Sequence, residues 1–246
     1  MEMFFFIYNK YYIIGENDRQ KEEIKMRKYK GIIFDLDGTL LDTIEDLTDS
    51  VNDVMEFYHF PKHDVQTCKM MVGNGFRKLI TRALPKDKQS DEKFIDEALA
   101  YFAEAYHKRY LNKTMPYDGI LDLIHTLEQK GIKVAINSNK RSDYTNALAN
   151  KFFETDLMTA VYGERESEGI PKKPDPAAAL EIADKMQLSV DAVLYVGDSK
   201  TDMQTGQNAG MDTIGVAWGF RGADELREHH ATYIVETPED ILNYVV

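Results

Sequence analysis

Two aspartates, Asp35 and Asp37, directly follow a short apolar run at residues 32–34. Such a run, bounded by turn residues, is typical of a strand buried on both faces, and side chains two residues apart point to the same side. In an open parallel sheet, the carboxyl ends of the strands face the ligand crevice. Two neighbouring carboxylates repel each other unless a cation joins them. The stretch therefore predicts a divalent metal site beside a nucleophile, although an acidic surface turn is an equal alternative on this stretch alone.

Composition limits the partners of this chain of 246 residues. Its formal net charge is −12, which argues against nucleic acid or an anionic membrane surface as a partner, since both attract basic proteins. The net charge does not exclude a small anionic substrate, because such a substrate needs only local positive charge. The single cysteine, Cys68, has no partner for an internal disulfide, so we expect a reducing, cytoplasmic setting.

Residues 1–25 differ from the rest of the chain. They are aromatic at first and then highly charged, and they are too short and too interrupted for a transmembrane span. They also lack the pattern of a secretory signal peptide. We interpret them as an N-terminal extension, loosely attached or disordered, or as sequence upstream of a natural start at Met26.

The remaining chain alternates between two patterns. Residues 43–116 carry apolar positions at helical spacing with no strand pattern, which predicts an inserted helical cap domain. Residues 26–42 and 117–246 alternate strands with helices and predict an α/β core domain, a doubly wound parallel sheet. We expect strands at residues 132–136, 159–162, 192–196 and 213–217, with a short one at 233–235.

Polar clusters follow three of these predicted strands. Asp35 and Asp37 end the first, Ser138 and Asn139 the second, and Asp198 with Asp202 the fourth, while Lys173 lies on a loop between them. Singly, each residue has an ordinary explanation as a helix cap, a solvated charge or a turn former. Together at one sheet edge they indicate phosphoryl transfer, with a carboxylate nucleophile, Mg²⁺ on hard oxygen ligands, and a lysine and a hydroxyl on the phosphate.

Four motifs resemble those of the haloacid dehalogenase-like hydrolases in order and spacing. They are DLDGT at 35–39, SN at 138–139, KP at 173–174 and GDSKTD at 197–202, and the resemblance spans about residues 29–220. It implies a Rossmann-like core, and the helical insertion resembles the C1 cap of that superfamily. Three stretches resemble phosphoglycolate phosphatases in particular: VGNG at 72–75, INSNK at 136–140 and YVGDSKTDMQTGQNAGM at 195–211.

The resemblance implies a role for each motif residue. Asp35 would attack phosphorus, and Asp37 would act as the general acid and base. Mg²⁺ would be held by Asp35, the main-chain carbonyl of Asp37, and Asp198. Phosphate binding would fall to Ser138, Asn139 and Lys173, with Thr39 supporting the turn and Asp202 orienting Lys173.

The substrate is the least determined prediction. The cap loop of Gly73, Asn74, Gly75 and Arg77 is expected to meet it, and Arg77 would either pair with a substrate carboxylate or be a surface charge. The segment 218–222 is expected to shape the rim of the crevice. We expect Mg²⁺-dependent hydrolysis of 2-phosphoglycolate. Pyrophosphatase, 5′-nucleotidase and sugar phosphatase or phosphomutase activities remain alternatives. So does a catalytically silent scaffold that binds a protein partner, and the sequence does not indicate the oligomeric state.

Overall fold

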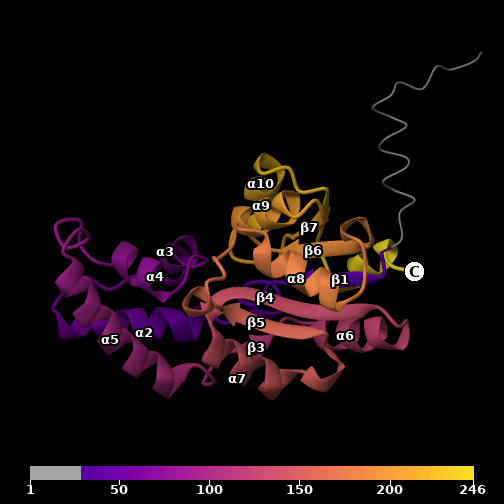
Figure 1. Cartoon of the computed structure of the whole chain (residues 1–246). Helices are drawn as coiled ribbons and strands as arrows, with labels where there is room; N and C mark the ends of the chain where they lie inside the picture. The colour runs from indigo at the N-terminus through magenta and orange to yellow at the C-terminus, as the bar shows by residue number, and fades with distance from the viewer. Residues whose placement is uncertain (1–28) are drawn as a thin grey trace, which may run out of the picture.

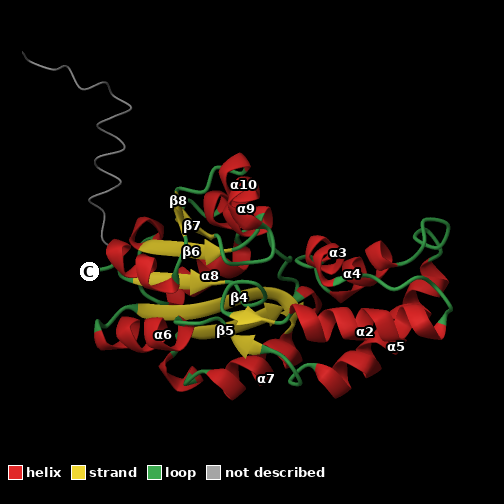
Figure 2. Ribbon diagram, turned by 180° about the vertical axis from the view of Figure 1, so that it is seen from behind, coloured by secondary structure: helices red, strands yellow, loops and turns green. Residues whose placement is uncertain are grey.

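A parallel six-stranded sheet forms the centre of the computed structural model, which describes residues 29–246. The strand order is β5-β4-β1-β6-β7-β8, and every neighbouring pair is parallel (Figures 1 and 2). The strands are β1 (Gly31–Phe34), β4 (Lys133–Arg141), β5 (Ala160–Glu164), β6 (Val193–Gly197), β7 (Asp212–Val216) and β8 (Tyr233–Val235). The prediction of a parallel α/β sheet is confirmed. Our interpretation of residues 1–25 and of Met26 as a start lies outside the described residues.

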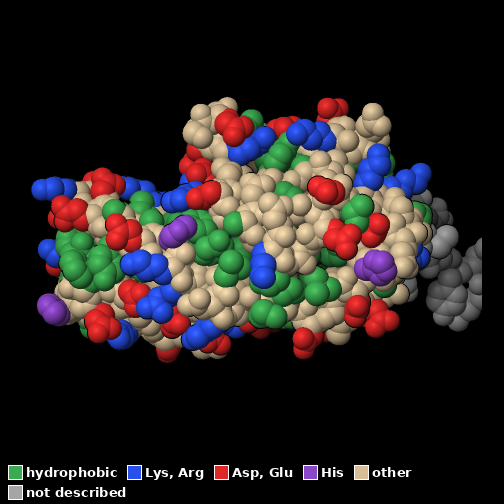
Figure 3. Space-filling view, turned by 90° about the horizontal axis from the view of Figure 1, so that it is seen from below, with side chains coloured by type: hydrophobic (Ala, Val, Ile, Leu, Met, Phe, Trp, Pro, Cys, Tyr) green, Lys and Arg blue, Asp and Glu red, His purple; other side chains and the backbone are tan. Residues whose placement is uncertain are grey.

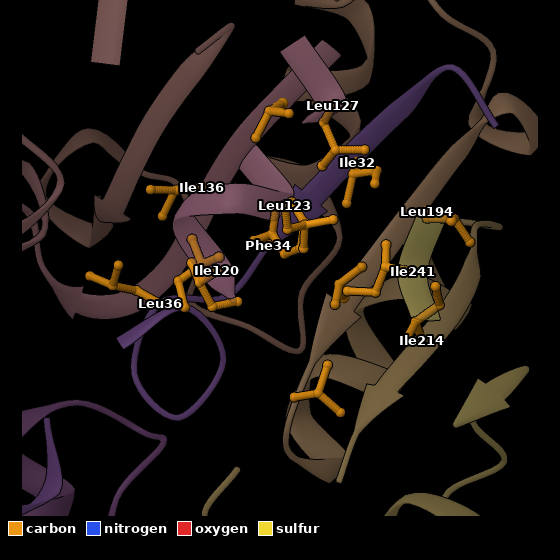
Figure 4. Close-up of a cluster of buried hydrophobic side chains, with 14 of the residues drawn as sticks. Ile32, Phe34, Leu36, Ile120, Leu123, Leu127, Ile136, Leu194, Ile214 and Ile241 are labelled. Atoms are coloured by element: carbon orange, nitrogen blue, oxygen red, sulfur yellow. The ribbon is translucent and has the colours of Figure 1, made fainter. Parts of the chain in front are cut away.

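Helices cover both faces of the sheet because its strands are apolar on both sides. Ile32 and Phe34 of β1 join one buried cluster, and Ile33 joins another on the opposite face. Figure 4 shows part of the first cluster, where Phe34 lies near Leu123. The first face packs on α6 (Ile120–Gln129) and α7 (Ser142–Phe152), and the second on α8 (Ala177–Lys185) and α9 (Lys200–Asn208), with α10 (Gly222–Glu228) beside β7 and β8. Short 3₁₀ helices lie at Thr155–Leu157, Glu166–Glu168, Val190–Ala192 and Pro238–Tyr244.

Four helices between β1 and β4 pack on one another beside the sheet (Figure 1). They are α2 (Ile44–Phe57), α3 (Val65–Met71), α4 (Phe76–Ala83) and α5 (Glu92–Arg109). Their apolar faces form a separate buried cluster that includes Val51, Leu79 and Phe102. The arrowheads of the strands point toward these helices in Figure 2, so this helical cap lies at the carboxyl ends of the strands. The exact division of the chain at residues 43 and 116 stays a prediction.

A two-stranded antiparallel ladder joins the two ends of the cap. It pairs β2 (Leu41–Asp42) with β3 (Met115–Pro116). Beside it, the buried carboxylate of Asp46 accepts hydrogen bonds from the backbone N–H groups of Lys113 and Thr114 and from the Thr114 hydroxyl, at 2.9–3.2 Å. Because carboxylate hydrogen bonds are stronger than neutral ones, Asp46 fixes the returning chain against the first cap helix.

The second strand along the core is longer than predicted. We expected residues 132–136, but β4 runs from Lys133 to Arg141 and includes the polar residues Asn137 to Lys140. The apolar pattern stops at Ile136, yet Asn137 pairs with Tyr162 of β5 and all four polar residues are buried. The ladder continues because tertiary contacts satisfy these side chains, which the apolar pattern alone does not indicate.

The surface carries both signs of charge. On the face in Figure 3, acidic and basic side chains are interspersed over the cap and the core. Within residues 29–246, no helix combines the length and the apolar character needed to cross a bilayer.

The Asp46 contact gives a stability prediction. We expect Asp46→Ala to lower the free energy of unfolding by about 3 kcal/mol, because the buried N–H and hydroxyl of Thr114 and the partly buried N–H of Lys113 lose their acceptor. Asp49→Ala is the matched control on the same helix, since its exposed ion pair with the Lys113 ammonium is worth about 0.5 kcal/mol. Urea unfolding of both variants measures the difference. Equal, small losses in the two variants would contradict the role given to Asp46.

Candidate functional site

The three central strands bring the polar clusters to one cavity. β1 lies between β4 and β6, so Asp35, Ser138 and Asp198 lie side by side at the carboxyl ends of these strands. The cavity has a volume of about 30 Å³, and its lining includes Asp37, Asn139, Lys140, Lys173 and Ser199 from the core. The cap contributes Leu47, Val72, Gly73, Gly75, Phe76 and Leu79, and the loop after β7 contributes Phe220 and Arg221. These two residues belong to segment 218–222, which we predicted to shape the rim; the other three residues of the segment are not in the lining.

A tight turn at Gly38 places the β1 loop against Asp198. Gly38 has φ +84°, and a Cβ atom on it would lie 2.3 Å from Oδ2 of Asp198. Only glycine tolerates both the backbone conformation and this approach. The same Oδ2 accepts a 2.7 Å hydrogen bond from the backbone N–H of Phe220, which orients the Asp198 carboxylate.

Lys173 joins two aspartates inside the site. Its Nζ lies 2.8 Å from Oδ1 of Asp35 and 2.7 Å from Oδ1 of Asp202. The other oxygen of Asp202 accepts from the backbone N–H and hydroxyl of Ser199, which closes a capping box at the start of α9. Burial alone would lower the pKa of Lys173, but the charges of Asp202 and Asp35 raise it well above its ordinary value. Lys173 is therefore a permanent cation held in place by the start of a helix.

Lys140 forms a second ion pair, which the sequence analysis did not assign. Its Nζ lies 2.9 and 3.1 Å from the two oxygens of Asp37, and the Thr43 hydroxyl donates to Oδ1 of Asp37 at 2.8 Å. Burial opposes the charged form of Lys140, yet Asp37 and Tyr106 together raise its pKa above the ordinary value. Lys140 could be found from the sequence only if the strand were known to continue past Ser138, which the apolar pattern does not indicate.

Asn139 connects the site to the cap. Its Oδ1 accepts from the backbone N–H of Lys173 at 2.8 Å, and its Nδ2 donates to the carbonyls of Lys173 and Gly73 at 3.1 Å each. Ser138 Oγ accepts from the backbone N–H of Lys140 at 3.2 Å, so the hydroxyl is oriented within the cavity wall. These contacts fix the loop that carries Lys173 and one cap carbonyl to the end of β4.

The remaining predicted residues divide into two groups. Gly73 and Gly75 line the cavity, and Thr39 is buried with a hydroxyl that has no hydrogen-bond partner within residues 29–246. Asn74 and Arg77 are not among the lining residues. Arg77 instead forms ion pairs with Glu92 and Asp96 on the exposed surface of the cap. The structure thus favours the surface-charge interpretation of Arg77 over the substrate-pairing one.

The donor set fits a hard divalent cation. Carboxylate oxygens of Asp35, Asp198 and Asp202 lie within 4.8 Å of one another, and all three residues are buried. Burial raises the pKa of Asp35 to about 7 although Lys173 opposes it, and burial together with Asp202 and Asp35 raises that of Asp198. These shifts mean that crowded carboxylates cost free energy, which a cation would offset. An all-oxygen set suits Mg²⁺. Both oxygens of Asp202 are occupied, by Lys173 and by Ser199, whereas Asp35 binds Lys173 through Oδ1 only, so Asp35 and Asp198 are the better candidates for ligands.

Comparison with known proteins agrees with this site. A family model described as haloacid dehalogenase-like hydrolase matches residues 32–216. The chain belongs to this family. It is an enzyme that hydrolyses phosphoric monoesters, that is, a phosphatase.

The similarity to its relatives extends over most of their length. A phosphoglycolate phosphatase of Psychrobacter arcticus is 31% identical over 87% of this chain and 95% of that protein. Phosphoglycolate phosphatase 1 of Pseudomonas aeruginosa is 29% identical over 86% of this chain and 78% of its own. A crystal structure from Lactobacillus delbrueckii subsp. bulgaricus, provisionally described as a phosphoglycolate phosphatase, is 34% identical, with a TM-score of 0.80 over 87% of this chain and 97% of that one. The expected fold, family and enzyme class are confirmed.

The carboxylate cluster gives a prediction about metal binding. We expect Mg²⁺ to raise the thermal unfolding midpoint, because an ion bound to the native state stabilises it by about 2.7 kcal/mol at a hundredfold excess over Kd. Asp198→Asn removes one of the two proposed carboxylate ligands and should abolish the rise, whereas Asp184→Asn, an exposed acid on α8, should keep it. Differential scanning calorimetry across a Mg²⁺ series measures this effect. An undiminished rise in Asp198→Asn would contradict the assignment.

Proposed function

We propose that this enzyme hydrolyses a small phosphate monoester, 2-phosphoglycolate, through an aspartyl-phosphate intermediate and with Mg²⁺ as cofactor. The observation that carries the proposal is the convergence of Asp35, Ser138, Lys173 and Asp198 around one small cavity under the cap. A scaffold that binds only a protein partner has no need for these buried charges, which cost free energy to maintain.

Asp35 is the nucleophile in this proposal. One of its carboxylate oxygens forms a bond to phosphorus while the bond from phosphorus to the leaving oxygen breaks. Asp37 gives its proton to that oxygen, so the leaving group departs as an alcohol. Lys173, whose ammonium lies 2.8 Å from Asp35, balances the negative charge of the transferring group, and Ser138 donates its hydroxyl to a phosphate oxygen.

The second half restores the enzyme. The Asp37 carboxylate takes a proton from water, and the water oxygen attacks phosphorus. The acyl-phosphate bond breaks, so inorganic phosphate leaves and the Asp35 carboxylate is regenerated. Lys140 and Thr43, which bind the Asp37 carboxylate, keep it aimed at the same place in both halves.

Mg²⁺ would be held by the carboxylates of Asp35 and Asp198 and by the main-chain carbonyl of Asp37. When bound, the ion neutralises charge on the phosphate and on the crowded carboxylates. Asp202 does not bind the ion in this proposal. It holds Lys173 in position through an ion pair and is itself oriented by a hydrogen bond from Ser199.

The size of the cavity supports a small leaving group. A volume of about 30 Å³ under the cap favours a leaving group of few atoms over a bulky one. Leu47, Phe76 and Leu79 of the cap, with Phe220 of the core, give it apolar walls that exclude water during transfer. Relatives named phosphoglycolate phosphatase point to the same two-carbon ester.

A cytoplasmic location is part of this proposal. It rests on the single cysteine, Cys68, which is buried in the cap as a free thiol and suits a reducing setting. The proposed partner is the small phosphorylated substrate alone.

Kinetics of two isosteric variants test the mechanism. We expect Asp35→Asn to abolish turnover of 2-phosphoglycolate and of p-nitrophenyl phosphate, because an amide cannot attack phosphorus. Asp37→Asn should lower kcat by about 10²–10⁴-fold, the usual contribution of a general acid and base. Asp118→Asn, an exposed acid outside the site, is the control and should retain wild-type rates.

Steady-state assays with Mg²⁺, repeated after EDTA and after Mg²⁺ is restored, measure both effects. A fully active Asp35→Asn enzyme would refute the mechanism. A wild type without turnover on any ester would instead favour the silent scaffold.

A further inference from the structure

A second cavity adjoins the catalytic one where the cap meets the core. Its volume is about 240 Å³, and Val72, Gly73, Ser199 and Arg221 line both cavities. The two cavities therefore lie on either side of the same four residues.

The second cavity is basic in a chain that is strongly acidic. Three cations line it: Arg82 from α4, Lys200 from α9 and Arg221 from the loop after β7. Glu225 is the only acidic residue in its lining, and its carboxylate lies 4.0 Å from Nε of Arg221 and accepts a hydrogen bond from the backbone N–H of Lys200. Against a formal net charge of −12, this local excess of positive charge favours a negatively charged ligand.

The two arginines come from opposite sides of the seam and repel each other. No ion pair of Arg82 occurs within residues 29–246. The Arg221 side chain is 11% exposed, and its acidic neighbours are Glu225 at 4.0 Å and the carboxylate of Asp198, whose pKa burial raises and the charge of Arg221 lowers. Burial, and then the charge of Arg221, lower the pKa of Arg82. An anion bound between the two guanidinium groups would remove this repulsion.

Hydrogen bonds to the cap loop fix the orientation of both guanidinium groups. Arg82 Nη1 donates to the carbonyl of Met71, and Arg221 Nη2 donates to that of Val72, each at 2.7 Å. Arg82 Nη2 also donates to Oδ1 of Asn74 at 2.7 Å, and Arg221 Nη1 lies 3.4 Å from the Met70 sulfur. A guanidinium has five N–H groups, so each arginine keeps donors beyond these contacts. The side chains are ordered before a ligand arrives, which lowers the entropy cost of binding.

Gly73 of the cap lies between Asn139, at the end of β4, and Arg221. The Gly73 carbonyl accepts from Asn139 Nδ2 at 3.1 Å, and a Cβ atom on Gly73 would lie 4.0 Å from Nη2 of Arg221. Gly73 is therefore next to Asn139 of the catalytic cavity on one side and to the Arg221 guanidinium on the other.

We propose that the cavity between Arg82 and Arg221 is an anion subsite, which binds the carboxylate of the leaving group and makes phosphate esters of short hydroxy acids the substrate class. This inference rests on the proposed phosphatase function and refines it. It assigns carboxylate recognition to Arg82 and Arg221, whereas the sequence pointed to Arg77.

A pair of two-carbon esters isolates the contribution of the carboxylate. One is 2-phosphoglycolate, and the other is 2-hydroxyethyl phosphate, which lacks the carboxylate. We expect Arg82→Gln and Arg221→Gln each to lower kcat/KM for 2-phosphoglycolate by about tenfold or more, mainly through KM, because each removes a charge-assisted hydrogen bond. For 2-hydroxyethyl phosphate, kcat/KM of Arg82→Gln should change about twofold or less, because Arg82 does not line the catalytic cavity. Arg82→Lys should recover part of the preference because it keeps the charge.

Two further variants separate local from general charge effects. Lys78→Gln removes one exposed positive charge from the same helix, α4, and should leave the ratio of kcat/KM values unchanged. Arg77→Gln tests the competing site. If Arg77→Gln lowers the ratio and both Arg82→Gln and Arg221→Gln keep it, the subsite proposal is overturned.

Equilibrium binding separates failure of the subsite from failure of the proposed function. In the Asp35→Asn background, calorimetry should give a lower Kd for 2-phosphoglycolate than for 2-hydroxyethyl phosphate, and Arg82→Gln should remove the difference. A wild type that hydrolyses both esters with equal kcat/KM and binds both with equal Kd would overturn the subsite and leave the phosphatase intact. A wild type that hydrolyses neither ester would overturn the proposed function, and the Kd ratio would still decide the subsite.

Discussion

Buried opposite charges at the carboxyl ends of β1, β4 and β6 are the interaction on which this structure depends. Lys173 joins Asp35 to Asp202, and Lys140 joins Asp37 to the wall of the same cavity. Separating any of these charges from its partner inside the protein would cost several kcal/mol. Each group is therefore held in place by its neighbours, and the reacting carboxylates are oriented before a substrate binds.

The sheet, the first turn of α9 and the cap each hold part of this charged cluster in place. The parallel sheet aligns the three strand ends, and the first turn of α9 fixes Asp202 through a capping box with Ser199. The cap closes the site from above, and its loop carbonyls at residues 71–73 accept hydrogen bonds from Arg82, Arg221 and Asn139 in turn. Two of these three donors, Arg221 and Asn139, belong to the core, so the cap loop is attached directly to residues that line the cavity.

Much of this could be predicted from sequence because the signals are local. Short apolar runs ending in Asp or Ser locate the strands, and four motifs in order locate the catalytic groups. Lys140 and the basic second cavity could not be predicted in the same way. Lys140 becomes meaningful only when β4 is seen to continue through its polar residues.

Arg82 and Arg221 are 139 positions apart in the sequence and meet only when the cap lies on the core. From the sequence, Arg77 was the candidate for binding a substrate carboxylate, because it follows the predicted cap loop. The structure turns it toward Glu92 and Asp96, because those acids lie on the facing helix α5.

The most direct measurement is mass spectrometry of the enzyme after rapid acid quenching during turnover of 2-phosphoglycolate with Mg²⁺. The account predicts one phosphoryl group on the peptide that contains Asp35, attached to that carboxylate, in the wild type and in the slower Asp37→Asn enzyme. Phosphoryl label on a different residue, or steady turnover without any phosphorylated Asp35 in either protein, would contradict it.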